Sequence, residues 1–356
     1  MTSFEPDRAR AGELRRSRPM LMAVGVMVVA LAVALVVVAG CSGPSSSSPL
    51  PVRAAGEVGL PGDSSRFDYA SLDADRGLLF VAHLGASEVI EVDVWAHRVV
   101  RTIPDLPQVH GVLVVPGLRR VYATATGANR VVSLDEDTGA VLHRAVTGEY
   151  PDGLAFDPHR GAVWTTNESG GSETVIDAAT GAVRGTVALG AEVGNVVYDP
   201  AGDRMLVAVQ GRNELAVIDP ATLAVIRRVP LPGCEHDHGL ALDPDSGVAF
   251  VACAANAALL TVDLTGWQVL GMNPVGDSPD VLAYDPGAHR LYVAAESGPL
   301  TVLDLGRDRR LGVAGSDHLA DGAHVVVVDP GTHHSYYPIP SGANGRPALL
   351  DEVPVR

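Results

Sequence analysis

A short segment returns seven times along the chain, and this repetition constrains the fold more than any other feature. In the clearest copies an apolar run ends in Asp-Pro, as in residues 152–158 and again in residues 280–286. The seven copies start at positions 68, 110, 152, 194, 238, 280 and 324, so successive starts lie 42 or 44 residues apart. Such a period indicates that one supersecondary unit is repeated as an array.

Within each unit, the sequence predicts four short strands separated by turns. Residues 161–167 show the pattern of a second strand, residues 214–219 that of a third, and residues 225–229 that of a looser fourth. Four short strands per unit of this length are typical of one blade of a β-propeller. We therefore predict an all-β fold, namely a seven-bladed β-propeller of four-stranded blades.

The two ends of the repeat region are expected to close the ring. The last unit supplies only three strands and ends near Asp351, whereas residues 54–60 have the pattern of one further strand. We expect this N-terminal strand to complete the last blade, because pairing it there removes two exposed sheet edges.

Composition indicates a folded and acidic protein. Hydrophobic residues make up 47% of the 356 residues, which excludes a disordered chain. The formal net charge is -16, and all 26 basic residues are Arg. Nucleic acid is not expected as a partner, because phosphate contacts need clustered cations.

The first 40 residues have the features of an export signal. A polar segment with five Arg residues precedes the apolar run Met20–Ala39, which is about as long as a bilayer core requires. The run ends in Val38-Ala39-Gly40-Cys41, which resembles the processing box of bacterial lipoproteins. The resemblance implies cleavage before Cys41 and lipidation of its sulfur, and the alternative is an uncleaved membrane anchor.

These features divide the chain into three parts. Residues 1–40 are interpreted as an export signal with a lipoprotein box, residues 41–55 as a flexible tether rich in Ser and Pro, and residues 56–356 as the propeller. With either kind of anchor, we expect the propeller at the extracytoplasmic face of the cell membrane.

Several strand sequences resemble the repeats of the YVTN family of β-propellers. The resemblance covers about residues 56–356 and rests on Val207-Ala208-Val209, Tyr292-Val293-Ala294, Thr174–Asp177 and Thr180–Val183. It implies a propeller but no particular activity, since the family includes surface-layer proteins, cofactor-bearing dehydrogenases and binding modules.

Polar residues recur where the repeats start. The first strand of each propeller blade lines the central channel, so we expect these side chains to converge at one mouth of the channel. The candidate ligand-binding residues of this ring are Asp68, His110, Asp152, Asn195 (beside Gly194), His238, Asp280 and His324.

Alternating imidazoles and carboxylates suit a divalent metal ion. Neutral His binds Zn²⁺ and similar ions, and a carboxylate either ligates the metal or orients the imidazole. We therefore name His110, His238 and His324 as candidate metal ligands. Alternatively, the ring could bind a polar small molecule, act as general acid and base, or merely hydrogen-bond neighbouring blades and shape turns.

Two further acids follow second strands in different blades. Glu168 and Glu296 each begin the triplet Glu-Ser-Gly. At the channel rim they would add to the ligand site or serve as bases, and the alternative is that they are solvated loop acids.

Two cysteines remain besides Cys41. Cys234 precedes the first strand of the fifth blade, and Cys253 ends the strand that pairs with it, so a hairpin turning at Asp245-Ser246 places both at one end. A disulfide is the expected state in an oxidising compartment. The alternative is a thiolate at Cys253 beside His238.

The leading functional hypothesis is a membrane-tethered, extracytoplasmic propeller that binds a metal or a small polar ligand at its channel mouth. The first alternative is a metal-assisted hydrolase or lyase that uses the same ring, with Glu168 or Glu296 as base. The second alternative is a surface scaffold for protein partners, in which the ring only stabilises the channel.

Overall fold

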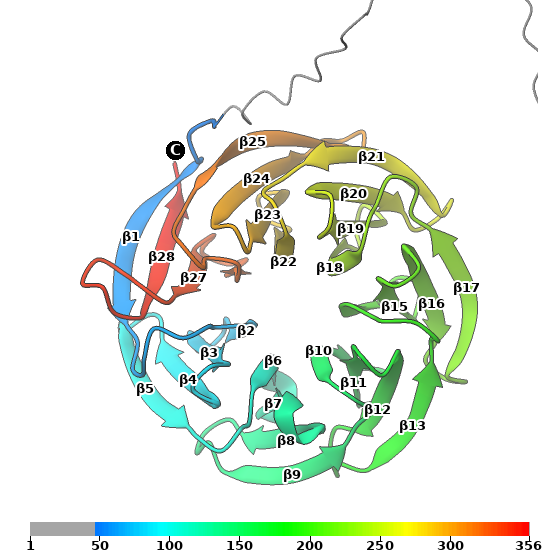
Figure 1. Ribbon diagram of the computed structural model, residues 1–356, viewed down its shortest axis with the longest axis horizontal. Helices are drawn as coiled ribbons and strands as arrows, with labels where there is room; N and C mark the ends of the chain where they lie inside the picture. The colour runs from blue at the N-terminus through cyan, green and yellow to red at the C-terminus, as the bar shows by residue number, and fades with distance from the viewer. Residues whose placement is uncertain (1–46, 356) are drawn as a thin grey trace, which may run out of the picture. The chain divides into compact units, whose positions relative to one another are not determined.

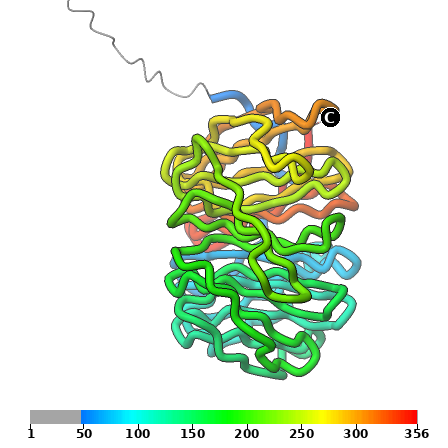
Figure 2. The backbone as a smooth tube through the Cα atoms, turned by 90° about the vertical axis from the view of Figure 1, so that its right-hand side faces the viewer, coloured from blue at the N-terminus to red at the C-terminus, as the bar shows by residue number. Residues whose placement is uncertain are grey.

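Seven four-stranded antiparallel sheets stand around a central axis like the blades of a propeller (Figure 1). The computed structural model describes residues 47–355, so the export signal, the lipoprotein box and Cys41 lie outside the described residues. Seen from the side, successive segments of the backbone lie stacked in layers (Figure 2). The predicted all-β, seven-bladed fold is confirmed. Within residues 47–355 we find no helix whose length and apolar character would let it cross a membrane.

Blades 1 to 7 follow one another in chain order, and the strands of each blade run from the channel outward. Blade 1 contains β2 (Ala70–Asp73), β3 (Leu78–His83), β4 (Glu88–Asp93) and β5 (Arg98–Ile103). Blade 2 contains β6 (Val109–Val115), β7 (Arg120–Ala125), β8 (Arg130–Asp135) and β9 (Val141–Val146), with short 3-10 turns at η1 (Pro116–Leu118) and η2 (Thr126–Ala128). Blade 3 contains β10 (Pro151–Asp157), β11 (Ala162–Asn167), β12 (Ser172–Asp177) and β13 (Val183–Ala188). Blade 4 contains β14 (Val196–Asp199), β15 (Arg204–Val209), β16 (Glu214–Asp219) and β17 (Ala224–Pro230).

The remaining three blades follow the same order. Blade 5 contains β18 (Asp237–Asp243), β19 (Val248–Cys253), β20 (Ala258–Asp263) and β21 (Gln268–Pro274). Blade 6 contains β22 (Pro279–Asp285), β23 (Arg290–Ala295), β24 (Pro299–Leu305) and β25 (Leu311–His318). Blade 7 contains β26 (Val327–Val328), β27 (Ser335–Ile339), β28 (Ala348–Pro354) and β1 (Val52–Gly59).

Blade 7 joins the two ends of the propeller. β1 pairs antiparallel with β28, from Val52 opposite Pro354 to Gly59 opposite Ala348. The predicted closure by an N-terminal strand is therefore confirmed. β1 begins at Val52 and not at residue 54, so the last residues of the predicted tether belong to the propeller, and Ser48 also forms an isolated bridge with Ser316 of blade 6.

The Asp of the repeated Asp-Pro segment has a structural role. At the end of β10, Asp157 Oδ1 accepts hydrogen bonds from the backbone N–H groups of His159 and Arg160, at 3.0 and 3.2 Å. A carboxylate that bonds the backbone two residues ahead fixes the turn into the next strand. The same contacts recur at Asp199, Asp243, Asp285 and Asp329.

Apolar faces of neighbouring blades pack against each other and form the core. Leu206 and Leu215 of blade 4, for example, lie in one buried cluster with Val251 and Leu260 of blade 5. Burial of such side chains contributes about 25 cal/mol per Å² of apolar surface, which stabilises the ring at every blade boundary.

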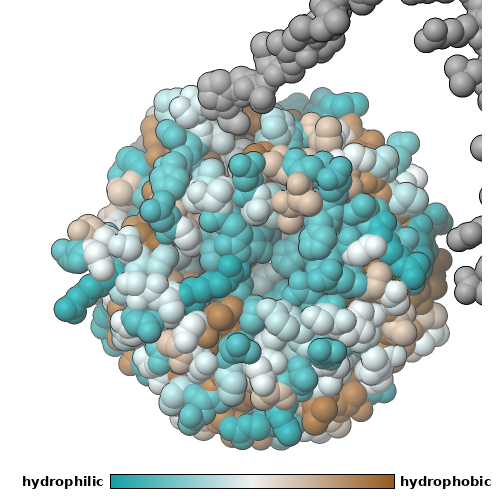
Figure 3. All heavy atoms as spheres, in the orientation of Figure 1, coloured by the Kyte–Doolittle hydropathy of each residue, from teal (hydrophilic) through white to brown (hydrophobic). Residues whose placement is uncertain are grey.

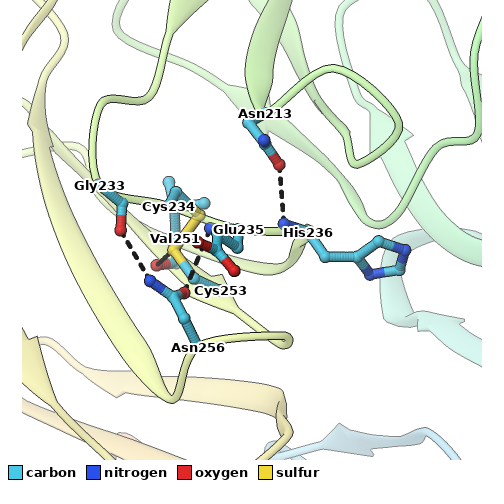
Figure 4. The surroundings of a disulfide bond; sticks show 8 residues. All are labelled: Asn213, Gly233, Cys234, Glu235, His236, Val251, Cys253 and Asn256. Carbon is cyan, nitrogen blue, oxygen red and sulfur yellow. Dashed lines mark hydrogen bonds between the residues drawn. A yellow bond between two sulfur atoms is a disulfide. The ribbon is translucent and has the colours of Figure 1, made fainter. Parts of the chain in front are cut away.

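A disulfide between Cys234 and Cys253 lies in this same cluster (Figure 4). It joins the segment before β18 to the end of β19, so Cys253 is not a free thiolate beside the ring. Asn256 Nδ2 donates to the carbonyl oxygen of Gly233 at 2.9 Å, and the backbone N–H of Glu235 donates to Asn256 Oδ1 at 3.2 Å. These contacts fix the segment that leads into blade 5.

Glu173 in β12 is an unusual part of the core. Its side chain is fully buried, and neither carboxylate oxygen has a hydrogen-bond partner. Burial raises the pKa of Glu173 well above its usual range, so the folded protein favours the protonated form of this group. In the unfolded chain the group ionises above about pH 4.3. The free energy of unfolding therefore decreases as pH rises above that value.

Substitution of Glu173 by Gln should remove this dependence. We expect Glu173→Gln to leave stability nearly unchanged at pH 4 and to stabilise the protein at pH 8, by up to about 5 kcal/mol, because each pH unit between the unfolded pKa and the raised folded pKa contributes about 1.4 kcal/mol. Denaturant unfolding of both proteins across this pH range measures the difference. Glu149→Gln, a change at an exposed acid, is the control and should show no such trend. A Glu173→Gln effect that is equal at pH 4 and pH 8 would contradict the account.

Candidate functional site

The first strands of four blades carry a β-bulge at the ring position. The pairing register shifts between Val109 and Val112 in blade 2, and at the equivalent places in blades 3, 5 and 6. A bulge adds one unpaired residue to a strand and changes the direction of its side chains. The bulges therefore place His110, Asp152, His238 and Asp280 along the wall of a cavity in the channel.

Glycines beside these ring residues let neighbouring blades approach closely. A Cβ added at Gly111 would lie 2.2 Å from the carbonyl oxygen of Asp152, and one at Gly239 would lie 2.1 Å from that of Asp280. Only glycine leaves room for the backbone of the next blade at these points. The ring residues of adjacent blades are thereby held near one another.

The cavity at this end of the channel has a volume of about 500 Å³. Figure 3 shows hydrophilic side chains gathered around the central hollow of one face. Seven predicted ligand-binding residues line the cavity, namely Asp68, His110, Asp152, Glu168, His238, Asp280 and Glu296. The polar or charged lining residues that sequence analysis did not select as ligands are Arg66, Tyr69, Gln108, Tyr150, Gln210, His236 and Ser278.

The other two predicted residues, Asn195 and His324, lie beside the cavity. Asn195 lines a second cavity of about 350 Å³, which is walled largely by aliphatic residues of the first strands. His324 is buried, with 3% of its surface exposed, and lies close to Asp280 and Asp68.

Tyr69 separates the two cavities. It belongs to blade 1, yet its hydroxyl lies 2.8 Å from Asn195 Oδ1, 3.4 Å from Asp152 Oδ2 and 3.3 Å from His238 Nε2, which belong to blades 4, 3 and 5. Tyr69 thus reaches across the channel, and within residues 47–355 it is the one residue that lines both cavities. Tyr69 therefore forms part of the boundary between the polar cavity and the second cavity.

Among the residues that the structure describes, Arg66 is the one arginine that lines the polar cavity. Its Nη1 lies 2.6 Å from Glu296 Oε1, whereas Nε lies 3.6 Å from Asp68 Oδ2 and Nη2 lies 3.6 Å from Asp280 Oδ2. Arg66 therefore hydrogen-bonds Glu296 and compensates the two aspartates only from a longer distance. Its side chain remains 42% exposed.

The loop that carries Arg66 is fastened to blade 1. Ser65 Oγ lies 3.1 Å from His83 Nε2, and His83 Nδ1 lies 3.4 Å from Glu88 Oε1. The imidazole of His83 also stacks on the ring of Phe67, with centroids 4.3 Å apart. These contacts position the backbone of Arg66 beside the cavity.

Burial among other acids disfavours ionisation of two ring carboxyls. Burial, with the nearby Asp152 and Asp280, raises the pKa of Asp68 well above its usual range, although Arg66 acts in the opposite direction. Burial also raises the pKa of Asp152 to about 7, with Glu168 and Asp280 adding to the effect and His238 opposing it. The cavity therefore holds more acidic groups than its own cations neutralise.

His238 is charged at neutral pH. Burial alone would lower its pKa, but the ion pair of Nε2 with Asp280 Oδ1, at 3.3 Å, raises the pKa of His238 to about 9. The same pairing outweighs burial at Asp280 and lowers the pKa of that carboxyl. His238 Nδ1 contacts Gln210 Oε1 at 3.0 Å, and Gln210 Nε2 donates to Glu168 Oε1 at 2.9 Å. One hydrogen-bonded chain thus links Glu168 to Asp280.

The three histidines predicted as metal ligands differ in their contacts. His110 Nδ1 bonds the carbonyl oxygen of Gln108 at 2.8 Å, and its Nε2 bonds the hydroxyl of Tyr150 at 3.0 Å. His238 likewise has partners on both nitrogens. In the described part of the chain, the side chains whose potential ligand atoms lie within 4.8 Å of one another are Asp68, Asp280 and His324. Of the three histidines, the structure brings His324 into such a group.

Comparison with solved structures finds other propellers. The chain superposes on hydrazine synthase of Kuenenia stuttgartiensis with a TM-score of 0.70 and 16% identity, over 79% of this chain and 94% of that one. Virginiamycin B lyase from Staphylococcus aureus gives 0.71 and 12%, over 85% and 99%, and the protein U3-55K gives 0.70 and 10%, over 83% and 98%. At these identities the likeness establishes the propeller fold alone. No family model and no curated protein sequence matches the chain, so the likeness to YVTN repeats remains a resemblance.

Removal of the Tyr69 hydroxyl tests whether its contacts across the channel stabilise the fold. We expect Tyr69→Phe to lower the free energy of unfolding by roughly 1–2 kcal/mol, because three polar groups lose a hydrogen-bond partner. Denaturant unfolding measures the loss. The matched control is Tyr292→Phe, because the buried hydroxyl of Tyr292 has no hydrogen-bond partner and its removal should cost little. Equal losses in the two variants would show that the contacts of Tyr69 do not stabilise the channel.

Proposed function

We propose that this protein binds a small cation in the acidic cavity at the mouth of its channel. The observation that carries the proposal is the charge of the cavity lining, in which five carboxyl groups face two cationic groups. The acids are Asp68, Asp152, Glu168, Asp280 and Glu296, and the cationic groups are Arg66 and His238.

The raised pKa values of Asp68 and Asp152 support a cationic ligand. Their cause is burial beside other carboxyls, without enough positive charge nearby. A bound cation supplies the missing charge and favours the ionised acids. The chain as a whole has a formal net charge of -16, which attracts cations toward the protein over longer distances.

Acid–base catalysis is a second candidate function. Asp152, with a pKa of about 7, and His238, with a pKa of about 9, both contact the Tyr69 hydroxyl from neighbouring parts of the wall. Between pH 7 and pH 9 Asp152 is ionised and His238 is protonated, so the pair offers a base and an acid for proton transfer. A lyase is among the proteins that share this fold, although the likeness concerns the fold alone.

The site of action follows from the N-terminal segment. We infer that the chain is exported and held at the extracytoplasmic face of the membrane by lipid on Cys41, which supports capture of a ligand from outside the cytoplasm. The basis is the sequence of residues 1–41, which lies outside the described residues.

A matched set of four-carbon ligands tests the selectivity for cations. In the presence of a chelator, putrescine should bind the full-length protein, whereas the neutral butane-1,4-diol and the anionic succinate should not. Binding should tighten from pH 6 to pH 8, because Asp152 ionises near pH 7. Isothermal titration calorimetry measures the three affinities, and mass spectrometry of the mixtures detects any turnover.

Charge-neutral variants locate the binding. Asp152→Asn combined with Glu168→Gln should weaken putrescine binding by at least about tenfold, or about 1.4 kcal/mol. Glu149→Gln, which changes an acid outside the cavity lining, should bind like the parent protein. Binding of succinate as tight as that of putrescine would contradict the proposal. Loss of stability in the double variant with no ligand bound by either protein would favour the scaffold hypothesis.

The anchor is tested separately. Cys41→Ser should abolish a lipid adduct detectable by mass spectrometry and release the protein from the membrane fraction. If Cys41→Ser stays in the membrane fraction and retains residues 1–40, the anchor is an uncleaved apolar segment and not a lipid.

A further inference from the structure

Asp68, Asp280 and His324 form a compact buried group where blades 1, 6 and 7 meet. One potential ligand atom from each lies within 4.8 Å of the others, and the residues are 2%, 7% and 3% exposed. The two carboxylates and one imidazole thus come from three separate segments of the chain. This convergence is a product of the closed ring, because the three segments are far apart in sequence.

The contacts of His324 define which of its nitrogens is free. Nδ1 lies 3.1 Å from the carbonyl oxygen of Gly322 and 3.7 Å from Glu296 Oε2. Both oxygens can only accept, so Nδ1 carries the proton and the lone pair of a neutral imidazole is on Nε2. Nε2 is buried and has no hydrogen-bond partner. A histidine that ligates a metal commonly donates its other N–H to a carbonyl or carboxylate in this manner.

His110 is a ring histidine in which both ring nitrogens have hydrogen-bond partners. Its Nδ1 makes the same kind of bond, to the carbonyl oxygen of Gln108, but its Nε2 is bonded by Tyr150. His324 occupies the equivalent position in its own repeat and has no tyrosine there. Burial of an unpartnered nitrogen costs about 1–3 kcal/mol, and a ligand on Nε2 would remove this penalty.

The carboxylates beside His324 also have unused capacity. Asp68 has Arg66 at 3.6 Å and His110 at 3.9 Å, both beyond hydrogen-bond distance. Asp280 uses Oδ1 for His238 and has Arg66 3.6 Å from Oδ2. The short contact of the Arg66 guanidinium is with a different acid, Glu296, at 2.6 Å. A cation between Asp68 and Asp280 would therefore be repelled by the positive charge of Arg66. It would not have to displace a hydrogen bond from Arg66 to either aspartate.

We propose that Asp68, Asp280 and His324 bind one divalent transition-metal ion, with Zn²⁺ as the best fit. The inference rests on the proposed function, because it names the cation that the acidic cavity takes. One imidazole with two carboxylates favours Zn²⁺ over Mg²⁺ and Ca²⁺, which prefer oxygen ligands alone. Three protein ligands leave a coordination position open toward the cavity.

Calorimetric titration of the full-length, untagged protein with Zn²⁺ tests the inference. We expect binding of one equivalent, and we expect His324→Gln to weaken it by more than about 100-fold, since loss of even an outer partner of a ligand costs about 10- to 100-fold. Asp68→Asn should weaken it likewise. His318→Gln is the control, because His318 is half exposed and lies outside the cavity lining.

Arg66→Gln should strengthen binding, whereas misfolding would only weaken it. Removal of the competing positive charge should tighten Zn²⁺ binding, by about tenfold or more, while the other two substitutions weaken it. Putrescine binding by His324→Gln then serves as the check that the cavity is intact.

Each outcome separates the two proposals. Zn²⁺ binding that depends on His324 and Asp68, and that tightens in Arg66→Gln, supports the metal site. Putrescine binding without Zn²⁺ binding, or Zn²⁺ binding that His324→Gln leaves unchanged, overturns the metal site and leaves the cation cavity standing. Failure of both putrescine and Zn²⁺ to bind overturns both.

Discussion

The pairing of β1 with β28 is the constraint on which the candidate site depends. It makes the first strand of the propeller part of the last blade, so blades 1 and 7 become neighbours. Asp68 follows β1 closely in sequence, whereas His324 precedes β26. The two side chains meet only because the ring is closed. Loss of that pairing would therefore separate the ligands as well as open the fold.

The channel places five carboxyl groups beside two cationic groups. Each blade contributes its own polar residue at the ring position, and the bulges and glycines at that position hold these residues close. Arg66 and His238 compensate part of the acidic charge. Tyr69 lies between this cavity and the second, largely aliphatic cavity. Surplus negative charge in a partly buried cavity favours a bound cation, because burial of unpaired charges is costly.

Much of the fold was predictable because the repeats are a property of the sequence itself. The spacing of the Asp-Pro segments predicted the number of blades, and the missing strand of the last unit predicted the closure. Asp157 and its equivalents turned out to fix turns, so the most regular residue of the repeat is structural. The candidate site lies instead at the less regular ring position. Five ring residues line one cavity, as the equivalence of the repeats leads one to expect, whereas Asn195 and His324 lie beside it.

The residues that decide the behaviour of the cavity were harder to find. Arg66 and Tyr69 flank the ring position of blade 1, where the other blades offer no equivalent, and their roles depend on contacts across the channel. One signal was available for Tyr69, because Gly111, Gly153 and Gly239 follow the ring residue in other repeats and a tyrosine replaces them here. The difference between His110 and His324 depends on Tyr150, which belongs to another blade, and no pattern within one repeat contains it.

Diffraction from crystals soaked separately with Zn²⁺ and with putrescine tests the central claim most directly. The account predicts electron density for at least one of these cations inside the cavity above Tyr69, with an anomalous zinc peak between Asp68, Asp280 and His324. Density confined to acids on the outer surface, with the cavity filled by water in both soaks, would contradict it.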